Sequence, residues 1–300
     1  CMNKIEIIGV PSDFGANTRG TNMGPAALRI AGLKQRLEVL GYQVTDLGDV
    51  GIPTRESLSM KDKTNNFLSV VTSLCHDLKS KVIVSLNNQA IPLIIGGDHS
   101  LAIGSISGVN EYLKKKELGL LWIDTHADFN NVKSSSSQNI HGMPLSVVLG
   151  EGYPELVALM NGKFIKPENT VIVGLRSIDG KEKDLLRKSG ITYFTMRDID
   201  ETGINQIMMK SINTMTKNTE GIHVSFDLDV LDPIYVPGVS TPVSGGLSLR
   251  ETHLILELLA ESKKVMSIDI VELNPYTDQA HQSATVAVEL IQSIFGKSIV

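Results

Sequence analysis

The chain has 300 residues, 42% of them hydrophobic, so it is long enough to bury a large core in one α/β domain. Lys and Arg total 28 against 33 Asp and Glu, and this net charge of -5 gives no electrostatic reason to expect nucleic acid or an anionic membrane as a partner. We therefore expect a small-molecule substrate.

The sequence carries no sign of secretion. No apolar stretch approaches the length of a membrane span, and the first residues lead directly into strand-like sequence. The two cysteines, Cys1 and Cys75, offer no disulfide framework, which suits a reducing compartment. We expect a cytoplasmic protein with one domain over residues 1–300, in which Cys1, placed before Met2, is a cloning remnant.

Strand and helix signals alternate from the start of the chain. An Ile-rich run predicts a first strand at Lys4–Val10, and Pro25 then begins a helix whose apolar spacing continues over Ala26–Leu40. A short strand at Gln43–Leu47 follows. The apolar stripe within Lys61–Ala90 predicts one long helix or two.

The same alternation continues to the C-terminus. Further strands are predicted at Pro92–Ile95, Leu118–Trp122, Thr170–Leu175, Ile191–Thr195, Ile222–Asp227 and Val265–Leu273. Further helices are predicted at Leu101–Lys116, Glu182–Lys188, Asn205–Thr216, Ser248–Ser262 and Ala284–Phe295. The pattern predicts a single three-layer α/β/α domain with a mostly parallel sheet of about eight strands.

Polar residues follow the strand at Leu118–Trp122 with a spacing of two. Side chains two residues apart in extended chain point to the same side, so Asp124, His126 and Asp128 should converge. Without a cation, the carboxylates would repel one another. The alternative is a solvated strand end with chance acids, but the same device recurs at Asp227 and Asp229 after another apolar run. A metal site is therefore predicted.

His99 completes the set, because it follows the strand at Pro92–Ile95. A phosphate-binding role for Gly96 and Gly97 is disfavoured, since the lysine and the spacing of that motif are missing. Oxygen ligands with some imidazole favour manganese over zinc held by thiolate. Two bridged metals would make a hydroxide near neutral pH, which predicts hydrolysis. The predicted ligands, four carboxylates and two imidazoles whose charge matches two divalent cations, are His99, Asp124, His126, Asp128, Asp227 and Asp229.

Five motifs resemble the ureohydrolase family, and the similarity runs in the family's order from Gly9 to the C-terminus. They are Gly-Gly-Asp-His-Ser at 96–100, Asp-Thr-His-Ala-Asp at 124–128, His-Gly-Met-Pro at 141–144, Ser-Phe-Asp-Leu-Asp at 225–229 and Val-Glu-Leu-Asn-Pro at 271–275. Within the family, Asn139–Leu145 with the preceding Asn130 and Ser137 is similar to arginases rather than to agmatinases.

This resemblance implies an enzyme that hydrolyses L-arginine to L-ornithine and urea by a metal-bridging hydroxide, with two Mn²⁺ per chain in a homo-oligomer, trimer or hexamer. One manganese would be held by His99, Asp124, Asp128 and Asp227. The other would be held by Asp124, His126, Asp227 and Asp229. Asp124 and Asp227 would bridge the two ions.

The resemblance also implies the roles of the substrate residues. Asn130, Ser137 and Ser135 would receive the α-carboxylate, in a loop that ends at Asn139. Asp179 and Glu182 would lie near the α-amino group, and Thr241 in the wall of the site. The residues expected to take part in catalysis are His141, Asp128 and Glu272, the last as the group that holds the guanidinium.

His141 is predicted to carry protons rather than to bind metal. The six ligands already satisfy two ions, and an imidazole that titrates near neutrality suits proton transfer to the leaving amine and from water. The alternative is a histidine that only anchors the preceding loop. His76, His223 and His253 are expected to be structural.

A few positions depart from the family's usual residues and are expected to affect how the substrate fits. Thr125 replaces Ala, Leu249 replaces Tyr, and Gly is replaced at Gln138, Val230 and Ser240. None of them is a predicted metal ligand.

Other functions remain open at this stage. An agmatinase, guanidinobutyrase or formiminoglutamase would keep the chemistry and change the substrate, and the loop 130–139 should discriminate, because Asn130 and Ser137 serve a substrate with an α-carboxylate. A single-zinc deacetylase is disfavoured, since His99 and Asp229 would be superfluous. A non-catalytic relative is disfavoured because all six ligands are present.

Overall fold

The computed structural model describes residues 3–64 and 66–298, and the expectation about Cys1 lies outside these residues. One sheet of eight strands runs through the molecule in the order β2-β1-β3-β8-β7-β4-β5-β6, and all neighbouring strands are parallel. The strands are β1 (Lys4–Val10), β2 (Gln43–Asp49), β3 (Ile91–Gly96), β4 (Leu118–Ile123), β5 (Thr170–Leu175), β6 (Thr192–Thr195), β7 (Gly221–Asp227) and β8 (Val265–Val271). The predicted α/β fold with about eight strands is confirmed.

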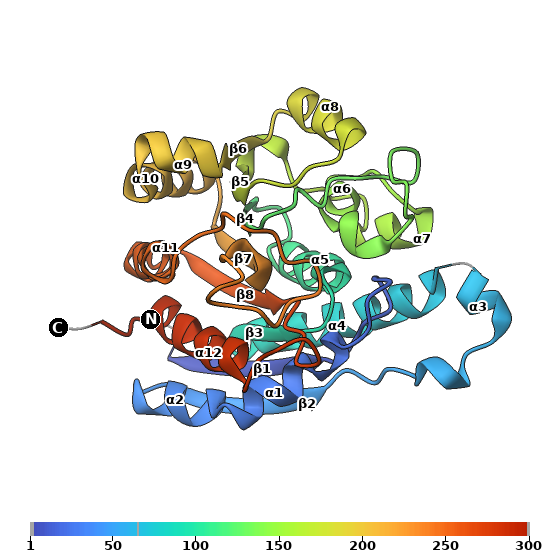
Figure 1. The fold of residues 1–300 in the computed structure, drawn as a ribbon, viewed down its shortest axis with the longest axis horizontal. Coiled ribbons are helices and arrows are strands. Elements are labelled where there is room, and N and C mark those ends of the chain that lie inside the picture. The colour runs from blue at the N-terminus through green and yellow to red at the C-terminus, as the bar shows by residue number, and fades with distance from the viewer. Residues whose placement is uncertain (1–2, 65, 299–300) are drawn as a thin grey trace.

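Helices cover both faces of the sheet, as Figure 1 shows. One face is covered by α4 (Leu68–Asn87), α5 (Ala102–Tyr112), α6 (Pro144–Val148), α7 (Pro154–Val157) and α8 (Gly180–Ser189). The short helix α3 (Met60–Thr64) precedes α4. The other face carries α1 (Gly24–Ile30), α2 (Leu33–Val39), α9 (Met196–Thr202), α10 (Ile204–Thr216), α11 (Leu249–Ser262) and α12 (Gln282–Ile294). The sheet thus lies between two layers of helices, and one hydrophobic core packs between the sheet and each helical layer.

The central strands form where apolar residues predominate. All residues of β4 and β7 are buried, which is what a parallel sheet covered on both faces requires. Helix starts are marked by capping boxes, with Ser248 before α11 and Thr195 before α9. None of the helices in the described part of the chain combines the length and apolar character needed to cross a membrane.

The prediction of one helix over Ala26–Leu40 is wrong, because the helix is interrupted between α1 and α2. Gly32 adopts a left-handed conformation there, with φ 83°. The apolar spacing continues across the break, so periodicity alone did not reveal it. Pro25 lies in the first turn of the first helix, directly after its first residue, Gly24, which agrees with the predicted helix start. The sequence analysis also missed α9, which is only seven residues long.

Candidate metal centre and substrate pocket

Polar residues gather where four adjacent strands in the middle of the sheet end. In spatial order, β3 is followed by His99 and β8 by Glu272. β7 ends at Asp227 and is followed by Asp229, and β4 is followed by the segment 124–128. Carboxyl ends of parallel strands share one edge of the sheet, which is where open α/β folds place their sites. The predicted ligands therefore lie together, and all of them except the partly exposed His126 are buried.

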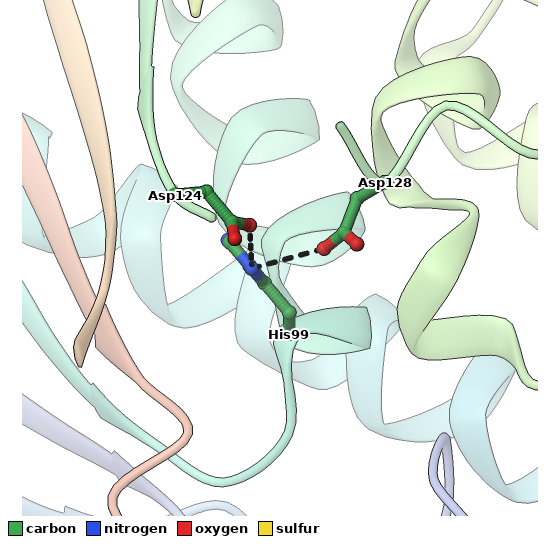
Figure 2. Close-up of side chains that lie close together, drawn as sticks. All are labelled: His99, Asp124 and Asp128. Atoms are coloured by element: carbon green, nitrogen blue, oxygen red, sulfur yellow. Dashed lines mark ion pairs between the residues drawn. The ribbon is translucent and has the colours of Figure 1, made fainter. Parts of the chain in front are cut away.

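Three carboxylates surround one nitrogen of His99. Its Nδ1 lies 3.1 Å from Oδ2 of Asp128 and 3.2 Å from Oδ2 of both Asp124 and Asp227. Figure 2 shows Asp124 and Asp128 converging on this nitrogen from separate segments. Nδ1 is buried, yet it makes no well-aligned hydrogen bond with the described residues. A buried nitrogen facing three carboxylates fits a cation held between them.

A second group of donors lies beside the first and shares Asp124. The Nδ1 atom of His126 is 3.2 Å from Oδ2 of Asp229 and 3.5 Å from Oδ1 of Asp124. Asp124 thus turns one oxygen toward each histidine, the arrangement that a bridging carboxylate needs. Asp227 differs, because its Oδ1 accepts the backbone N–H of Asp229 at 2.8 Å while Oδ2 faces His99.

The electrostatics of this cluster favour positive charge at its centre. Burial lowers the pKa of His99, but the surrounding carboxylates raise it well above its usual range. Burial also lowers the pKa of His126, and Asp229 raises it, to about 12. Burial and repulsion from Asp124 raise the pKa of Asp128 to about 6. The carboxylates that raise the pKa of both histidines would equally stabilise a cation held between them.

Local hydrogen bonds and backbone conformation hold two of the predicted ligands, Asp124 and Asp128, in place. Asp124 accepts hydrogen bonds from the indole Nε1 of Trp122 at 2.9 Å and the backbone N–H of His126 at 2.6 Å. Asp128 adopts a left-handed conformation with φ 48°. Such strained positions cluster at functional sites, because the surrounding structure must hold them.

A cavity of about 170 Å³ opens beside the cluster. Its volume suits a small molecule, and it brings together the predicted substrate and catalytic residues from loops that are remote in the sequence. Its lining comprises His126, Asp128, Asn130, Ser135, Ser137, Asn139, His141, Gly142, Ser177, Asp179, Glu182, Asp227, Thr241 and Glu272. Gly142 and Ser177 were not predicted as site residues. Gly142 lies in the His-Gly-Met-Pro motif at 141–144, whereas Ser177 lies in none of the five motifs.

Asp179 and Glu182 lie at the start of α8, where they also have a structural role. They form a capping box, with Asp179 at the N-cap. Glu182 further accepts the backbone N–H of Phe129 at 2.8 Å, and burial raises its pKa to about 7. Asp179 Oδ2 lies 3.5 Å from the amide nitrogen of Asn130. The helix start is thereby fixed against the segment that follows the metal cluster.

Glu272 contacts a predicted metal ligand, His99, and also lines the cavity. Its Oε1 accepts the backbone N–H of His99 at 2.9 Å and lies 3.1 Å from Nδ1 of His141. Its Oε2 is buried and has no hydrogen-bond partner among the described residues. Burial lowers the pKa of His141, but the hydrogen bond with Glu272 raises it to about 9. The sequence analysis did not foresee this pairing of two predicted catalytic residues.

A buried polar cluster behind His99 was also missed. His99 Nε2 lies 2.9 Å from Oγ of Ser225, which donates to Asp269 Oδ2 at 3.5 Å. The same Asp269 oxygen lies 3.0 Å from Nε2 of His223 and accepts the hydroxyl of Ser105 at 2.6 Å. The signal available in the sequence was Asp269 inside a mostly apolar strand, two residues after Ser267.

The positions that depart from the family's usual residues lie outside the cavity lining. Thr125 donates its hydroxyl to the backbone carbonyl of Asp229 at 2.7 Å, which ties two ligand-bearing segments together. Ser240 Oγ accepts a hydrogen bond from the amide of Asn274 at 3.0 Å. Gln138 donates its side-chain Nε2 to two backbone carbonyls of its own loop, those of Val132 and Ser135. Their effect on substrate fit stays a prediction.

Comparisons with known proteins agree with this geometry. The model of the Arginase family matches residues 3–296. The arginase of Bacillus caldovelox is 43% identical over 99% of this chain and 100% of its own length. The native structure of the B. caldovelox arginase at pH 5.6 superposes with a TM-score of 0.94 over 99% of both chains. The Entamoeba histolytica arginase in complex with L-ornithine is 32% identical, with a TM-score of 0.90 over 99% of both chains. The chain therefore belongs to the arginase family.

Proposed function

We propose that this protein hydrolyses L-arginine to L-ornithine and urea at a centre of two manganese ions. The observation that carries this proposal is a single cavity lined by two kinds of group. Its lining includes proposed metal ligands and Glu272, whose Oε2 has no hydrogen-bond partner among the described residues, and it also includes Asn130, Ser135 and Asp179. An arginine molecule has a guanidinium at one end and an α-carboxylate with an α-amino group at the other, so it matches both.

Manganese fits the donors of the cluster. In this proposal one ion is held by His99, Asp124, Asp128 and Asp227, and the other by Asp124, His126, Asp227 and Asp229. Oxygen donors with imidazole and no thiolate favour manganese or a similar ion. When bound, two such ions would supply a nucleophile from water at neutral pH.

Glu272 is proposed to hold the guanidinium. A buried carboxylate oxygen without a partner is costly, and a guanidinium N–H would satisfy it with a charge-assisted hydrogen bond. Glu272 also adopts a left-handed conformation with φ 64°. Strained backbone of this kind is concentrated at functional sites, which supports a functional role for Glu272. Its fixed contact with the N–H of His99 would keep the guanidinium next to the metal ligands.

His141 is proposed to move the proton that the reaction requires. The side-chain amino group of ornithine must gain a proton as it leaves. The imidazole of His141 lies beside Glu272, the proposed guanidinium ligand, and is therefore placed to donate that proton. At the far end of the cavity, Asp179 would attract the α-ammonium group of the substrate. Asn130, Ser135 and Ser137 would donate hydrogen bonds to the α-carboxylate, with Asn139 and Thr241 in the wall.

Agmatine, guanidinobutyrate and formiminoglutamate are the alternative substrates. The polar loop at the cavity end favours arginine over agmatine, because a site built for a polar group rejects an analogue that lacks it. Homo-oligomeric assembly and a cytoplasmic location are further proposals. Family membership supports the first, and the low cysteine content supports the second.

Metal binding can be tested apart from activity. The four carboxylates of the cluster repel one another without cations, so binding should stabilise the fold. At free manganese of about 100 times Kd, linkage gives about 2.7 kcal/mol per site. Metal analysis after reconstitution should approach two ions per chain, with a higher Tm than the metal-free protein. A protein that retains no manganese and shows no change in Tm would refute the proposed centre.

A further inference from the structure

The loop 130–139 is held in one shape by a residue that does not line the cavity. Gln138 uses both ends of its side-chain amide. Its Nε2 donates to the backbone carbonyls of Val132 at 2.9 Å and Ser135 at 2.6 Å, and its Oε1 accepts the hydroxyl of Tyr153 at 3.2 Å. The amide thus closes the loop into a ring and fastens that ring to the segment that precedes α7.

The backbone of Gln138 fixes the orientation of Ser135. Gln138 adopts a left-handed conformation with φ 59°, which residues other than glycine adopt at a cost. In this conformation its backbone N–H donates to Oγ of Ser135 at 3.0 Å. Because the hydroxyl oxygen of Ser135 accepts from the loop, its O–H is left to donate into the cavity that Ser135 lines.

The first half of the loop is braced in the same manner. Asn131 Oδ1 accepts the backbone N–H groups of Lys133 at 3.0 Å and Ser134 at 3.1 Å. Ser134 Oγ then donates to Asn130 Oδ1 at 2.8 Å, so the amide nitrogen of Asn130 turns toward Asp179. Donors for the substrate carboxylate are therefore set before the substrate arrives.

We propose that Gln138 is a positioning residue that orders the loop 130–139 in advance and thereby sets the preference for substrates with an α-carboxylate. This proposal rests on the proposed function. Ordering a flexible loop on binding costs conformational entropy, and a loop that is already ordered avoids this cost. A substrate such as agmatine has no carboxylate for the loop to bind, so it gains little from the ordering.

The test compares Gln138→Ala with the control Ser136→Ala, a change at an exposed position of the same loop. Alanine keeps the backbone preference of a non-glycine residue and removes the amide. The KM for arginine should rise roughly 5- to 30-fold in Gln138→Ala, with kcat within about twofold of the wild type. For agmatine, measured as substrate or as competitive inhibitor, the constants should not change. Tyr153→Phe removes one of the three contacts and should give an intermediate rise.

Hydrogen exchange supplies a readout that is independent of turnover. In the metal-loaded, substrate-free protein, the backbone N–H groups of residues 134 and 138 should exchange faster in Gln138→Ala than in Ser136→Ala. Equal losses toward arginine and agmatine, or exchange no faster than in the control, would overturn the proposal. A wild-type protein inactive on arginine would overturn the proposed function instead, and the exchange comparison would still decide whether Gln138 orders the loop.

Discussion

Glu272 couples two residues that have different tasks in the proposed reaction. Its Oε1 meets both the backbone of His99 and the imidazole of His141, while its Oε2 is left for the substrate. Guanidinium binding would therefore bring a positive charge next to a carboxylate that also raises the pKa of His141. Such a charge lowers the proton affinity of the imidazole, which favours release of the proton once the substrate is bound.

This arrangement predicts the behaviour of His141→Asn. If His141 carries protons, the variant should keep both metals and most of its affinity for arginine, while kcat falls roughly 10- to 1000-fold. Added imidazole should restore part of the rate. Steady-state kinetics and metal analysis on one preparation decide the matter. Loss of manganese would mark His141 as a ligand, and an unchanged kcat would mark it as a loop anchor.

The two oxygens of Asp124 make a second prediction at the residue scale. Because Oδ2 faces His99 and Oδ1 faces His126, Asp124→Ala should weaken both metal sites. Asp229→Ala removes a carboxylate of the same size that lies beside His126 and makes no ion pair with His99 among the described residues. The loss of manganese affinity should be about 10- to 100-fold greater for Asp124→Ala at the His99 site. Equal losses at that site, measured by equilibrium dialysis, would show that Asp124 does not bridge.

At the scale of elements, the register between β7 and β8 places a polar layer behind the metal cluster. His223 pairs with Ser267, and Ser225 pairs with Asp269, so these side chains lie on one face beneath α5. If Nδ1 of His99 binds a metal, as we propose, its Nε2 would carry the proton and would donate to Oγ of Ser225, which lies 2.9 Å away. The hydroxyl of Ser225 then donates toward Asp269, which orients the ligand.

Asp269→Asn tests the importance of this layer. The change keeps the volume and removes the carboxylate, so the manganese held by His99 should bind about 10- to 100-fold more weakly, and the other ion should be little affected. Ser267→Ala is the matched control, because it removes a contact of His223 and leaves the path from Asp269 to His99 intact. Similar weakening in both variants, seen in manganese titrations followed by electron paramagnetic resonance, would mean that only packing is disturbed.

The elements were largely predictable, because buried parallel strands read as apolar runs between helical stripes. The polar residues after β3, β4 and β7 were predictable for the same reason, since each follows such a run directly. The positions of the loops were not. The left-handed conformations of Asp128 and Glu272 leave no mark in the sequence. Nor does the contact between His141 and Glu272, which joins loops 131 residues apart.

At the scale of the whole molecule, the strand order makes the site. β3, β8, β7 and β4 are neighbours in the sheet although they are far apart along the chain. Alternation of strands and helices indicates a parallel sheet, but many strand orders satisfy it. Residue patterns alone could therefore propose a set of six ligands for one metal site, but not which ligands would hold which ion. The resemblance to ureohydrolases supplied the proposed division of the ligands between two ions, and the structure brings these side chains to one edge of the sheet.

The central claim is that this fold joins a manganese centre to a pocket for the α-carboxylate of arginine. The most direct measurement is urea release from arginine and from agmatine, side by side, with manganese-loaded and metal-free protein. We predict rapid release from arginine, a much lower kcat/KM for agmatine, and loss of both activities without metal. A higher kcat/KM for agmatine, or activity that is unaffected by removal of metal, would contradict the claim.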